Sequence, residues 1–250
     1  MTGTLQGRIA LVTGGGRGIG AAIATALAAE GAAVAVTYPD RQADAEAVAA
    51  SIVAAGGRAL ALAGDVTDEA AAAGAVAATI RTWGGLDILV NNAGILVERG
   101  LLDMPVAEFD RVIAVNLRGT YITGQAAIRH MDRVGRGRVI NIASDLAYFG
   151  REQFSAYCAS KAGILSLTKS WAREFAPRIL VNAICPGPID TEMLGAANMS
   201  PEWRRKEQAI PLARFGRPEE VAASAVFLAG PGGDFMTGQA IHPNGGSVMP

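Results

Sequence analysis

The chain has 250 residues, of which 50% are hydrophobic and 18% charged, and its formal net charge is −1. This balance excludes intrinsic disorder, which requires low hydrophobicity and high net charge. It also lacks the positive excess with which proteins attract nucleic acids or anionic membranes, so we expect neither partner. Glycine is unusually frequent, with 31 residues against an average usage of ~7%.

Cysteine and histidine are too scarce for a disulfide framework or a multi-histidine metal site. The chain has Cys158, Cys185, His130 and His242, and these four do not stand at metal-ligand spacing. No uninterrupted apolar run reaches the ~18–20 residues that cross a membrane. We therefore expect a cytoplasmic protein with free thiols, without a metal site and without a membrane segment.

Short β-branched runs alternate with longer Ala-rich segments along the whole chain. We expect strands at residues 9–13, 33–38, 59–63, 88–91, 138–142, 180–184 and 240–242, and helices at 19–30, 41–55, 69–82, 106–131, 155–175 and 219–229. Strands that are apolar on both faces and alternate with helices are typical of a parallel sheet covered by helices. The sequence therefore predicts an α/β fold: one doubly wound, Rossmann-type parallel sheet of about seven strands with helices on both faces.

The chain shows no internal boundary. It has no linker rich in Pro or Ser and no shift in composition, so we expect a single domain over residues 1–250. The one long stretch without a regular pattern covers residues 187–218. Because irregular segments of that length in compact domains are usually functional, we expect residues 188–217 to form a substrate-binding loop or lid.

A glycine-rich segment follows the first predicted strand and leads directly into the first predicted helix. Its glycines fit the pattern T-G-x-x-x-G-x-G, with Gly14, Gly18 and Gly20. Glycines let the backbone turn sharply and approach a phosphate, and a helix N-terminus presents free N–H groups and the positive end of its dipole. This context predicts a dinucleotide pyrophosphate site; the alternative is a glycine turn without a ligand. The missing G-K-[ST] ending excludes a P-loop.

The end of the second predicted strand bears on the choice between NAD(H) and NADP(H). An acidic residue there binds a ribose 2′-hydroxyl, whereas basic residues accept a 2′-phosphate. The deciding position is Tyr38, which is not acidic, and Arg17 and Arg41 could flank a phosphate. Asp40 lies near the spacing expected of an acidic ribose ligand, which leaves NAD(H) possible. We favour NADP(H).

Three polar side chains in the second half of the chain suit proton transfer. Ser144 follows the fifth predicted strand, and Tyr157 and Lys161 stand four residues apart on the next predicted helix, hence on one face of it. An adjacent ammonium group and a cationic nicotinamide both lower the pKa of a phenol. We expect Tyr157 to exchange a proton with a carbonyl or alcohol oxygen that Ser144 binds, beside a hydride carrier. Taken alone, Tyr-x-x-x-Lys also occurs by chance on many helices.

Together these motifs resemble the short-chain dehydrogenase/reductase family, in its single-domain branch of similar length. The resemblance runs from Gly7 to Gly246. It rests on segments in the family's order and spacing: Thr13-Gly14-x-x-x-Gly18-x-Gly20, Asn91-Asn92-Ala93-Gly94, Ser144, Tyr157-x-x-x-Lys161, and Pro186-Gly187 followed by Ile189 and Thr191. The subgroups that look most similar are 3-oxoacyl-carrier-protein reductases and glucose 1-dehydrogenase-like enzymes.

The resemblance implies a role for each matched residue. Tyr157 would be the general acid/base, Ser144 would bind the reacting oxygen, and Lys161 would hold the nicotinamide ribose and lower the pKa of Tyr157. Asn116 would position a water in a proton relay to Lys161. The implied cofactor contacts are Gly14, Arg17, Gly18, Ile19, Gly20, Tyr38, Arg41, Asp65, Val66, Asn92, Ala93, Gly94, Tyr157, Lys161, Pro186, Gly187, Ile189 and Thr191.

Substrate contacts are expected from the segment after Ser144, from the loop after the fourth strand and from the lid. The candidates are Leu96, Leu146, Tyr148, Phe154, Met193 and Trp203, half of which could simply anchor the lid. The chain departs from the family pattern at Asp145, where a small or neutral residue is more common, and at Asn244, where an aspartate is usual. Asp145 could repel an anionic substrate, bind a hydroxyl group, or be a solvated loop carboxylate.

Two other classes of protein share parts of this pattern. A catalytically silent nucleotide-binding regulator on the same fold would normally lack at least one of Asn116, Ser144, Tyr157 and Lys161, and all four are present. A sugar-nucleotide epimerase or dehydratase needs a larger C-terminal substrate domain than the chain leaves after Lys161. The sequence therefore predicts an oxidoreductase that transfers a hydride between a nicotinamide cofactor and a small-molecule ketone or secondary alcohol.

The family resemblance also implies a homotetramer. Ala-rich faces on the helices predicted at residues 106–131 and 155–175 would let two copies approach closely. In this family two such helices from each of two subunits form a four-helix interface. The C-terminal strand forms the second interface, which completes the tetramer.

Overall fold

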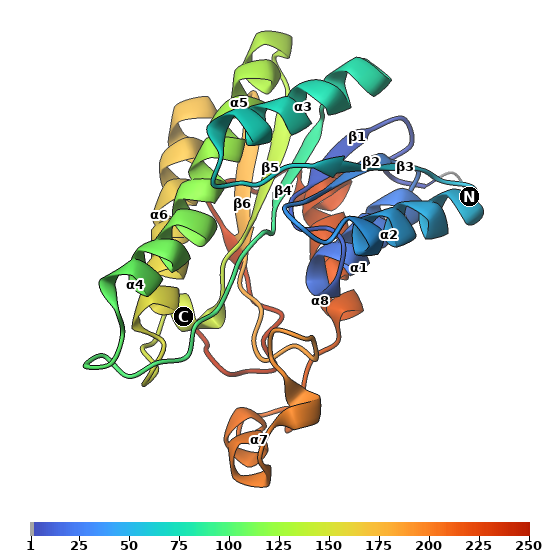
Figure 1. Cartoon of the computed structure of the whole chain (residues 1–250). Helices are drawn as coiled ribbons and strands as arrows, with labels where there is room; N and C mark the ends of the chain where they lie inside the picture. The colour runs from blue at the N-terminus through green and yellow to red at the C-terminus, as the bar shows by residue number, and fades with distance from the viewer. Residues whose placement is uncertain (1–2) are drawn as a thin grey trace.

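The computed structural model describes residues 3–250, which form a seven-stranded parallel sheet (Figure 1). Residues 1 and 2 of the expected domain lie outside the described residues. The strand order is β3-β2-β1-β4-β5-β6-β7. The strands are β1 (Ile9–Val12), β2 (Ala33–Tyr38), β3 (Arg58–Ala63), β4 (Ile88–Asn91), β5 (Gly137–Ile142), β6 (Ile179–Ile184) and β7 (Ala240–Ile241). Each predicted strand is confirmed to within one residue at either end.

Helices cover both faces of the sheet, which confirms the predicted fold class (Figure 1). They are α1 (Gly18–Ala29), α2 (Gln42–Ala54), α3 (Glu69–Trp83), α4 (Val106–Ile113), α5 (Gly119–Val134), α6 (Ser155–Phe175), α7 (Pro201–Glu207) and α8 (Pro218–Ala229). Helices α1, α2 and α8 contribute to the core on one face, and α3, α5 and α6 to the core on the other. Within residues 3–250, no helix combines the length and apolarity that crossing a membrane requires.

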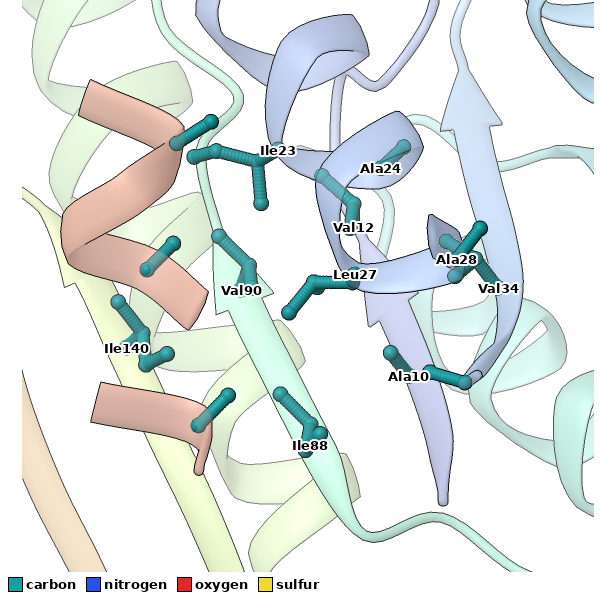
Figure 2. Close-up of a cluster of buried hydrophobic side chains, with 14 of the residues drawn as sticks. Ala10, Val12, Ile23, Ala24, Leu27, Ala28, Val34, Ile88, Val90 and Ile140 are labelled. Carbon is teal, nitrogen blue, oxygen red and sulfur yellow. The ribbon is translucent and has the colours of Figure 1, made fainter. Parts of the chain in front are cut away.

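The apolar strands are explained by this double covering. Successive residues of a strand point to opposite faces of the sheet. In β1, Ala10 and Val12 pack under α1 and α8 (Figure 2). Leu11 packs under α3, α5 and α6 on the other face. All three side chains are fully buried. A sheet with one solvated face would instead alternate apolar and polar residues.

The strand order indicates where on the sheet a ligand would bind. The chain proceeds outward from β1 through β2 to β3 and then returns to β4 on the other side of β1. From the carboxyl edge of the sheet, the chain after β1 therefore leads to α1 on one face, and the chain after β4 leads to α5 on the other. Ligands of doubly wound sheets bind in the crevice at such a switch point.

Two predicted segments differ in detail from the structure. The helix predicted over residues 106–131 is divided into α4 and α5 by a π-helical segment, Ala114–Arg118, and such wide turns are frequent at functional sites. The stretch predicted to be irregular contains α7, which projects from the layered body (Figure 1). Ser200 caps α7 by accepting a hydrogen bond from Trp203 N at 3.1 Å, and Pro201 is its first residue. Ser200 and Pro201 are a helix start signal that the sequence contains. A helix of seven residues, however, is too short to show a helical hydrophobic periodicity.

Candidate active site

The loops after β1 and β4 are bonded to each other at the carboxyl edge of the sheet. The hydroxyl Oγ1 of Thr13 accepts hydrogen bonds from the backbone N–H groups of Asn92 and Ala93, each at 3.0 Å. The side-chain amide of Asn92 donates to Thr13 O at 2.9 Å and to Gly14 O at 3.1 Å. These four bonds fix the glycine loop against the Asn92-Ala93-Gly94 segment.

The glycine loop has the shape of a phosphate cradle. Gly14 has a φ of +62°, and a Cβ placed there would lie 3.1 Å from Ala93 Cα. A Cβ at Gly20 would lie 2.4 Å from Gly14 O. Helix α1 begins at Gly18, and its N-cap residue Arg17 provides no side-chain cap. The first N–H groups of α1 are thus available to a ligand, so these residues fit a dinucleotide pyrophosphate.

Arg17 and Arg41 converge on one carboxylate from the segment expected to be the lid. Arg17 Nη1 lies 2.5 Å from Glu192 Oε2, and Arg41 Nη1 lies 3.2 Å from the same oxygen. Both arginines are N-cap residues, of α1 and α2 respectively. Tyr38 ends β2 close by in the sequence and brings no negative charge.

The other expected cofactor residues are distributed around the same edge. Asp65 Oδ1 accepts hydrogen bonds from Thr67 N and Thr67 Oγ1, both at 2.8 Å, so this side chain stabilises its own turn. Val66 is buried, and a Cβ at Gly119 would lie 2.6 Å from it, which places it against the start of α5. Ile19 is partly buried against the core on the α1 and α8 side.

The start of the expected lid contacts both the glycine loop and the C-terminal segment. A Cβ at Gly18 would lie 3.4 Å from Thr191 Cγ2, so Thr191 faces the glycine loop. A Cβ at Gly187 would lie 2.7 Å from Asn244 O. Pro186 O accepts a hydrogen bond from Asp145 N at 3.0 Å, and Ile189 is buried.

Ser144, Tyr157 and Lys161 are brought together by β5 and α6. Ser144 follows β5 and caps the 3₁₀ turn Asp145–Ala147. Lys161 Nζ lies 5.5 Å from the centre of the Tyr157 ring and donates a hydrogen bond to Ile142 O at 2.8 Å. Ser144 and Lys161 are both buried. A Cβ at Gly94 would lie 3.6 Å from Lys161 Nζ, so the loop after β4 closes this cluster on one side.

Burial dominates the titration of these groups. It raises the pKa of Tyr157 above its ordinary value, a hydrogen bond with Ser144 opposes the rise, and the Asp145 carboxylate adds to it. Burial also lowers the pKa of Lys161 to about 8. Tyr157 is therefore a neutral phenol over the physiological range, which is the form that can give a proton to a substrate oxygen.

Asn116 lies in the π-helical segment and is fully buried. Its Oδ1 accepts from Ile95 N at 2.8 Å, and its Nδ2 donates to Ile95 O and to Ser160 Oγ, both at 3.0 Å. Ser160 Oγ donates in turn to the backbone oxygen of Tyr157 at 2.7 Å. Asn116 thus connects the loop after β4 to the helix that carries Tyr157. Its backbone oxygen accepts a hydrogen bond from Thr120 Oγ1 at 2.7 Å.

Several expected substrate residues hold the lid in place in this structure. Phe154 and Trp203 lie against the guanidinium group of Arg151, which is 5.2 Å and 5.0 Å from the two ring centres. Arg151 also forms a buried ion pair with Glu207 of α7 at 2.6 Å. The remaining candidates include the buried Leu146, the half-buried Leu96, Tyr148 with its ring 5.0 Å from that of His242, and Met193, which is exposed. A cleft between the loop after β4 and the lid has in its lining Glu98, Leu194, Met199 and Trp203.

The structure corrects the interpretation of Asp145 as a solvated carboxylate. Asp145 is only 5% exposed. It accepts hydrogen bonds from Ser144 Oγ at 3.0 Å, from Leu146 N at 2.8 Å and from Ser247 Oγ. The sequence shows that an aspartate follows Ser144, but it contains no signal that Ser247 returns to this place. In residues 3–250, no cluster of three or more His, Cys, Asp or Glu side chains could hold a metal ion.

Asn244, the second departure from the family pattern, stabilises the C-terminal turn. Its Oδ1 accepts a hydrogen bond from Gly246 N at 2.9 Å, and its Nδ2 donates to Val248 O at 2.8 Å. Asn244 therefore holds the residues on either side of Ser247.

The glycine loop and the Ser144–Tyr157–Lys161 cluster share the crevice in which doubly wound sheets bind dinucleotides, and this places the chain among the nicotinamide-dependent oxidoreductases. Residues 14–247 match a family model described as enoyl-(acyl carrier protein) reductase. The 3-oxoacyl-(acyl-carrier-protein) reductase of Synechocystis sp. is 41% identical over 247 residues, which are 98% of each chain.

Solved structures agree with this assignment. A dehydrogenase/reductase from Sinorhizobium meliloti is 43% identical and superposes with a TM-score of 0.93, over 98% of this chain and 97% of that one. A short-chain dehydrogenase from Burkholderia cenocepacia in complex with NADP is 41% identical, with a TM-score of 0.91 over 97% of this chain and 98% of that one. The chain belongs to the short-chain dehydrogenase/reductase family, as its motifs predict. It is an oxidoreductase of CH–OH and C=O groups, and the catalytically silent alternative is not favoured.

Proposed function

We propose that this enzyme uses NADPH to reduce the ketone of a 3-oxoacyl thioester to a secondary alcohol. The observation that carries the reaction is the meeting of Ser144, Tyr157 and Lys161 beside the glycine loop. The substrate class is supported by the relative from Synechocystis sp., which is named as a 3-oxoacyl-(acyl-carrier-protein) reductase.

The residues of the cluster divide the work of the reaction. A bound nicotinamide would supply the hydride that the carbonyl carbon receives. The Ser144 hydroxyl binds the carbonyl oxygen, and the Tyr157 phenol gives its proton to the same oxygen as negative charge develops there. The ammonium group of Lys161, 5.5 Å from the Tyr157 ring centre, then stabilises the phenolate that remains. Hydride and proton together convert the ketone to the alcohol.

Asn116 and Lys161 return the proton to Tyr157 through a water held near Asn116. The supporting observation is that Asn116 joins the loop after β4 to Ser160, which is bonded to the backbone of Tyr157. A shift of Asn116 is therefore transmitted to the turn of α6 that carries the phenol.

The choice of NADP(H) rests on charge. Arg17 and Arg41 both reach one oxygen of Glu192, so an anion between them is surrounded by two guanidinium groups. A ribose 2′-phosphate is such an anion, and arginine matches its geometry. The relative from Burkholderia cenocepacia, whose structure contains NADP, is 41% identical.

The remaining cofactor contacts follow the chain around the crevice. Gly14, Gly18 and Gly20 at the start of α1 would hold the pyrophosphate, together with Ile19, Asn92, Ala93 and Gly94. Asp65 and Val66 would hold the adenine, and Pro186, Gly187, Ile189 and Thr191 would hold the nicotinamide end. The position of Thr191 next to Gly18 supports this arrangement, because it brings the start of the lid to the glycine loop.

Residues 188–217 form a lid over the substrate, in one domain that covers the chain. Glu192 near the start of this segment pairs with Arg17, and Glu207 near its middle pairs with Arg151. The substrate lies between the lid and the loop after β4, against Leu96, Leu146, Tyr148, Phe154, Met193 and Trp203.

We also propose a homotetramer. The most exposed large apolar side chains of residues 3–250 lie in two separate regions of the sequence. Leu101, Leu102 and Val106 lie before and at the start of α4 and are 75%, 97% and 75% exposed. Phe235 precedes β7, Met249 follows it, and they are 104% and 78% exposed. Clustered exposed apolar side chains mark association surfaces, and two such regions suit an assembly with two kinds of interface.

Loss of NADPH absorbance measures the proposed activity directly. Acetoacetyl-coenzyme A serves as the 3-oxoacyl thioester, with ethyl acetoacetate, cyclohexanone and glucose (assayed in the oxidising direction with NADP) as comparisons. The proposal expects the highest kcat/KM for the thioester. A higher kcat/KM for a simple ketone or for glucose would contradict the substrate class while leaving the reaction class in place.

A further inference from the structure

Four side chains lead away from the reaction centre, and hydrogen bonds join three of them. Ser144 lies close enough to Tyr157 to act on its pKa, Ser144 Oγ donates to Asp145 Oδ1 at 3.0 Å, and Ser247 Oγ donates to Asp145 Oδ2. The last bond spans 102 residues, and in Figure 1 the C-terminus lies at the end of α6 that carries Tyr157. The first two members are the ordinary reaction residues, whereas Asp145 and Ser247 have no role in the function proposed above.

Asp145 has the surroundings of a carboxylate rather than of a neutral acid. Its two oxygens accept three hydrogen bonds, from Ser144, Leu146 and Ser247. A protonated carboxyl group would carry a hydrogen that needs an acceptor of its own. Burial and the charge of Glu207 raise the pKa of Asp145, and the three hydrogen bonds oppose this rise.

Groups with charge or a titratable proton face Asp145 from several elements. They are Tyr157 of α6, Cys185 after β6, Glu207 of α7 and His242 after β7. Glu207 is paired with Arg151 at 2.6 Å, so its charge is compensated. Burial raises the pKa of Cys185 to about 12 and lowers the pKa of His242, so both are neutral in weakly alkaline solution. Asp145 is thus the negative charge of this group, and the ammonium of Lys161 on α6, 5.5 Å from the Tyr157 ring centre, is the positive charge nearest to Tyr157.

The carboxylate is not needed to cap the 3₁₀ turn. Leu146 N donates to Ser144 Oγ at 3.1 Å as well as to Asp145 Oδ1 at 2.8 Å. Ser144 alone therefore satisfies this N–H group. What Asp145 adds is a negative charge one hydrogen bond away from Ser144. The single hydroxyl hydrogen of Ser144, which Asp145 accepts here, turns to the carbonyl oxygen when a substrate binds.

We propose that Asp145 is a positioning residue of the active site, which places a negative charge next to Ser144 and Tyr157 and so extends the pH range over which Tyr157 acts as a proton donor. The inference rests on the proposed function of Tyr157. A negative charge disfavours the phenolate, so the phenol stays protonated to higher pH. Ser247 serves this arrangement by fixing the far oxygen of the carboxylate.

The pH profile of kcat/KM separates this role from a purely structural one. The reaction is NADPH-dependent reduction of acetoacetyl-coenzyme A, or of whichever ketone in the panel the wild type reduces fastest. In Asp145→Asn and Asp145→Ser the alkaline fall of the profile moves to lower pH by roughly one unit, because a nearby negative charge has been removed. The Lys161 ammonium, with a pKa of about 8, also loses its proton in this range, so tyrosinate absorbance of the same variants, with Tyr157→Phe as reference, shows that Tyr157 is the group that shifts. Asp145→Glu keeps the charge and therefore keeps the alkaline fall near its wild-type position. Asp110→Asn, which removes an exposed carboxylate on α4, is the matched control and leaves the profile unchanged.

Ser247→Ala tests the positioning half of the inference. It leaves the charge in place but frees one end of the carboxylate, so kcat/KM falls roughly threefold to tenfold while the alkaline fall stays where it is. The inference is overturned if both neutral variants at position 145 keep the wild-type alkaline fall, or if Ser247→Ala has wild-type kinetics. A lower melting temperature with an unmoved profile means that Asp145 is only structural.

Failure of the proposed function gives a different result. If the wild type reduces no ketone in the panel, the proposed function fails, and the same variants are then titrated by tyrosinate absorbance. In the neutral variants the phenol of Tyr157 ionises at lower pH than in the wild type. Adding Tyr157→Phe removes this ionisation from the titration curve. Identical tyrosinate titrations of wild type and neutral variants overturn the inference in that case.

Discussion

Arg17 in the glycine loop is paired with Glu192, which lies 175 residues later at the start of the lid segment, at 2.5 Å. Arg41 reaches the same oxygen at 3.2 Å. The two arginines are about half exposed, so their charges are accessible to a cofactor from solution. This pairing leads to two predictions about cofactor choice, one for the arginines and one for the carboxylate.

Replacing either arginine is expected to weaken binding of NADPH but not of NADH. In Arg17→Gln and Arg41→Gln, the Kd for NADPH rises roughly tenfold, because a charge-assisted contact to the 2′-phosphate is lost. Fluorescence titration with both reduced cofactors measures the two constants. Arg81→Gln, on the exposed side of α3, is the matched control. If the wild type binds NADH more tightly than NADPH, the choice of NADP(H) is wrong.

Replacing Glu192 is expected to have the opposite effect. Glu192→Gln removes the anion that competes with the 2′-phosphate for the two arginines, so NADPH binds more tightly. The gain is modest, roughly threefold, because exposed ion pairs contribute little free energy, and it shrinks at high salt. The same titration, repeated at two ionic strengths, measures it. An equal gain for NADH would show that Glu192 acts on the lid and not on the phosphate site.

Tyr157→Phe is expected to abolish turnover and leave NADPH binding nearly intact. The substitution removes the one hydroxyl that carries the proton, while the ring still fills its place against Lys161. The steady-state rate and the Kd for NADPH, measured on the same preparation, separate the two functions. Turnover at the wild-type rate would refute the assignment of Tyr157 as general acid/base.

The sequence predicts the sheet and the position of the reaction residues because both depend on local patterns. Val34, Val36, Val90 and Ile140 are apolar since both faces of the sheet are covered. The motifs directly follow β1, β4 and β5, so the parallel strands bring them to one edge of the sheet. The partners of Asp145 could not be predicted in this way. Ser247 reaches Asp145 through a turn held by Asn244, and Glu192 reaches Arg17 across the crevice. Such contacts depend on the packing of loops, which leaves no period in the sequence.

Lys161 is expected to cost stability in return for its role in the reaction. Burial lowers its pKa from 10.5 to about 8, so between these values the unfolded chain binds more protons than the folded one, and the free energy of unfolding rises with pH. Lys161→Met removes this dependence. At pH 7 the variant is more stable than the wild type by on the order of 3 kcal/mol. The hydrogen bond from Lys161 to Ile142 O, which the variant loses, reduces this difference.

Chemical denaturation at a series of pH values measures this difference. The advantage of Lys161→Met is largest below pH 8 and disappears as the pH approaches 10.5. Lys169→Met is the matched control, because this lysine is exposed on the same helix. A wild type whose stability relative to Lys161→Met does not change over this pH range would mean that the Lys161 ammonium is solvated.

The two exposed apolar regions are expected to form two different interfaces of a tetramer. Phe235→Ser removes the side chain that is 104% exposed near β7, and Leu102→Ser removes one that is 97% exposed before α4. Because each variant weakens a different interface, each is expected to give dimers, and the double variant is expected to give monomers. Val53→Ser, on α2 and 54% exposed, lies outside both regions and leaves the tetramer intact. Sedimentation at micromolar concentration measures the mass of each species, and a monomeric wild type would contradict the assembly.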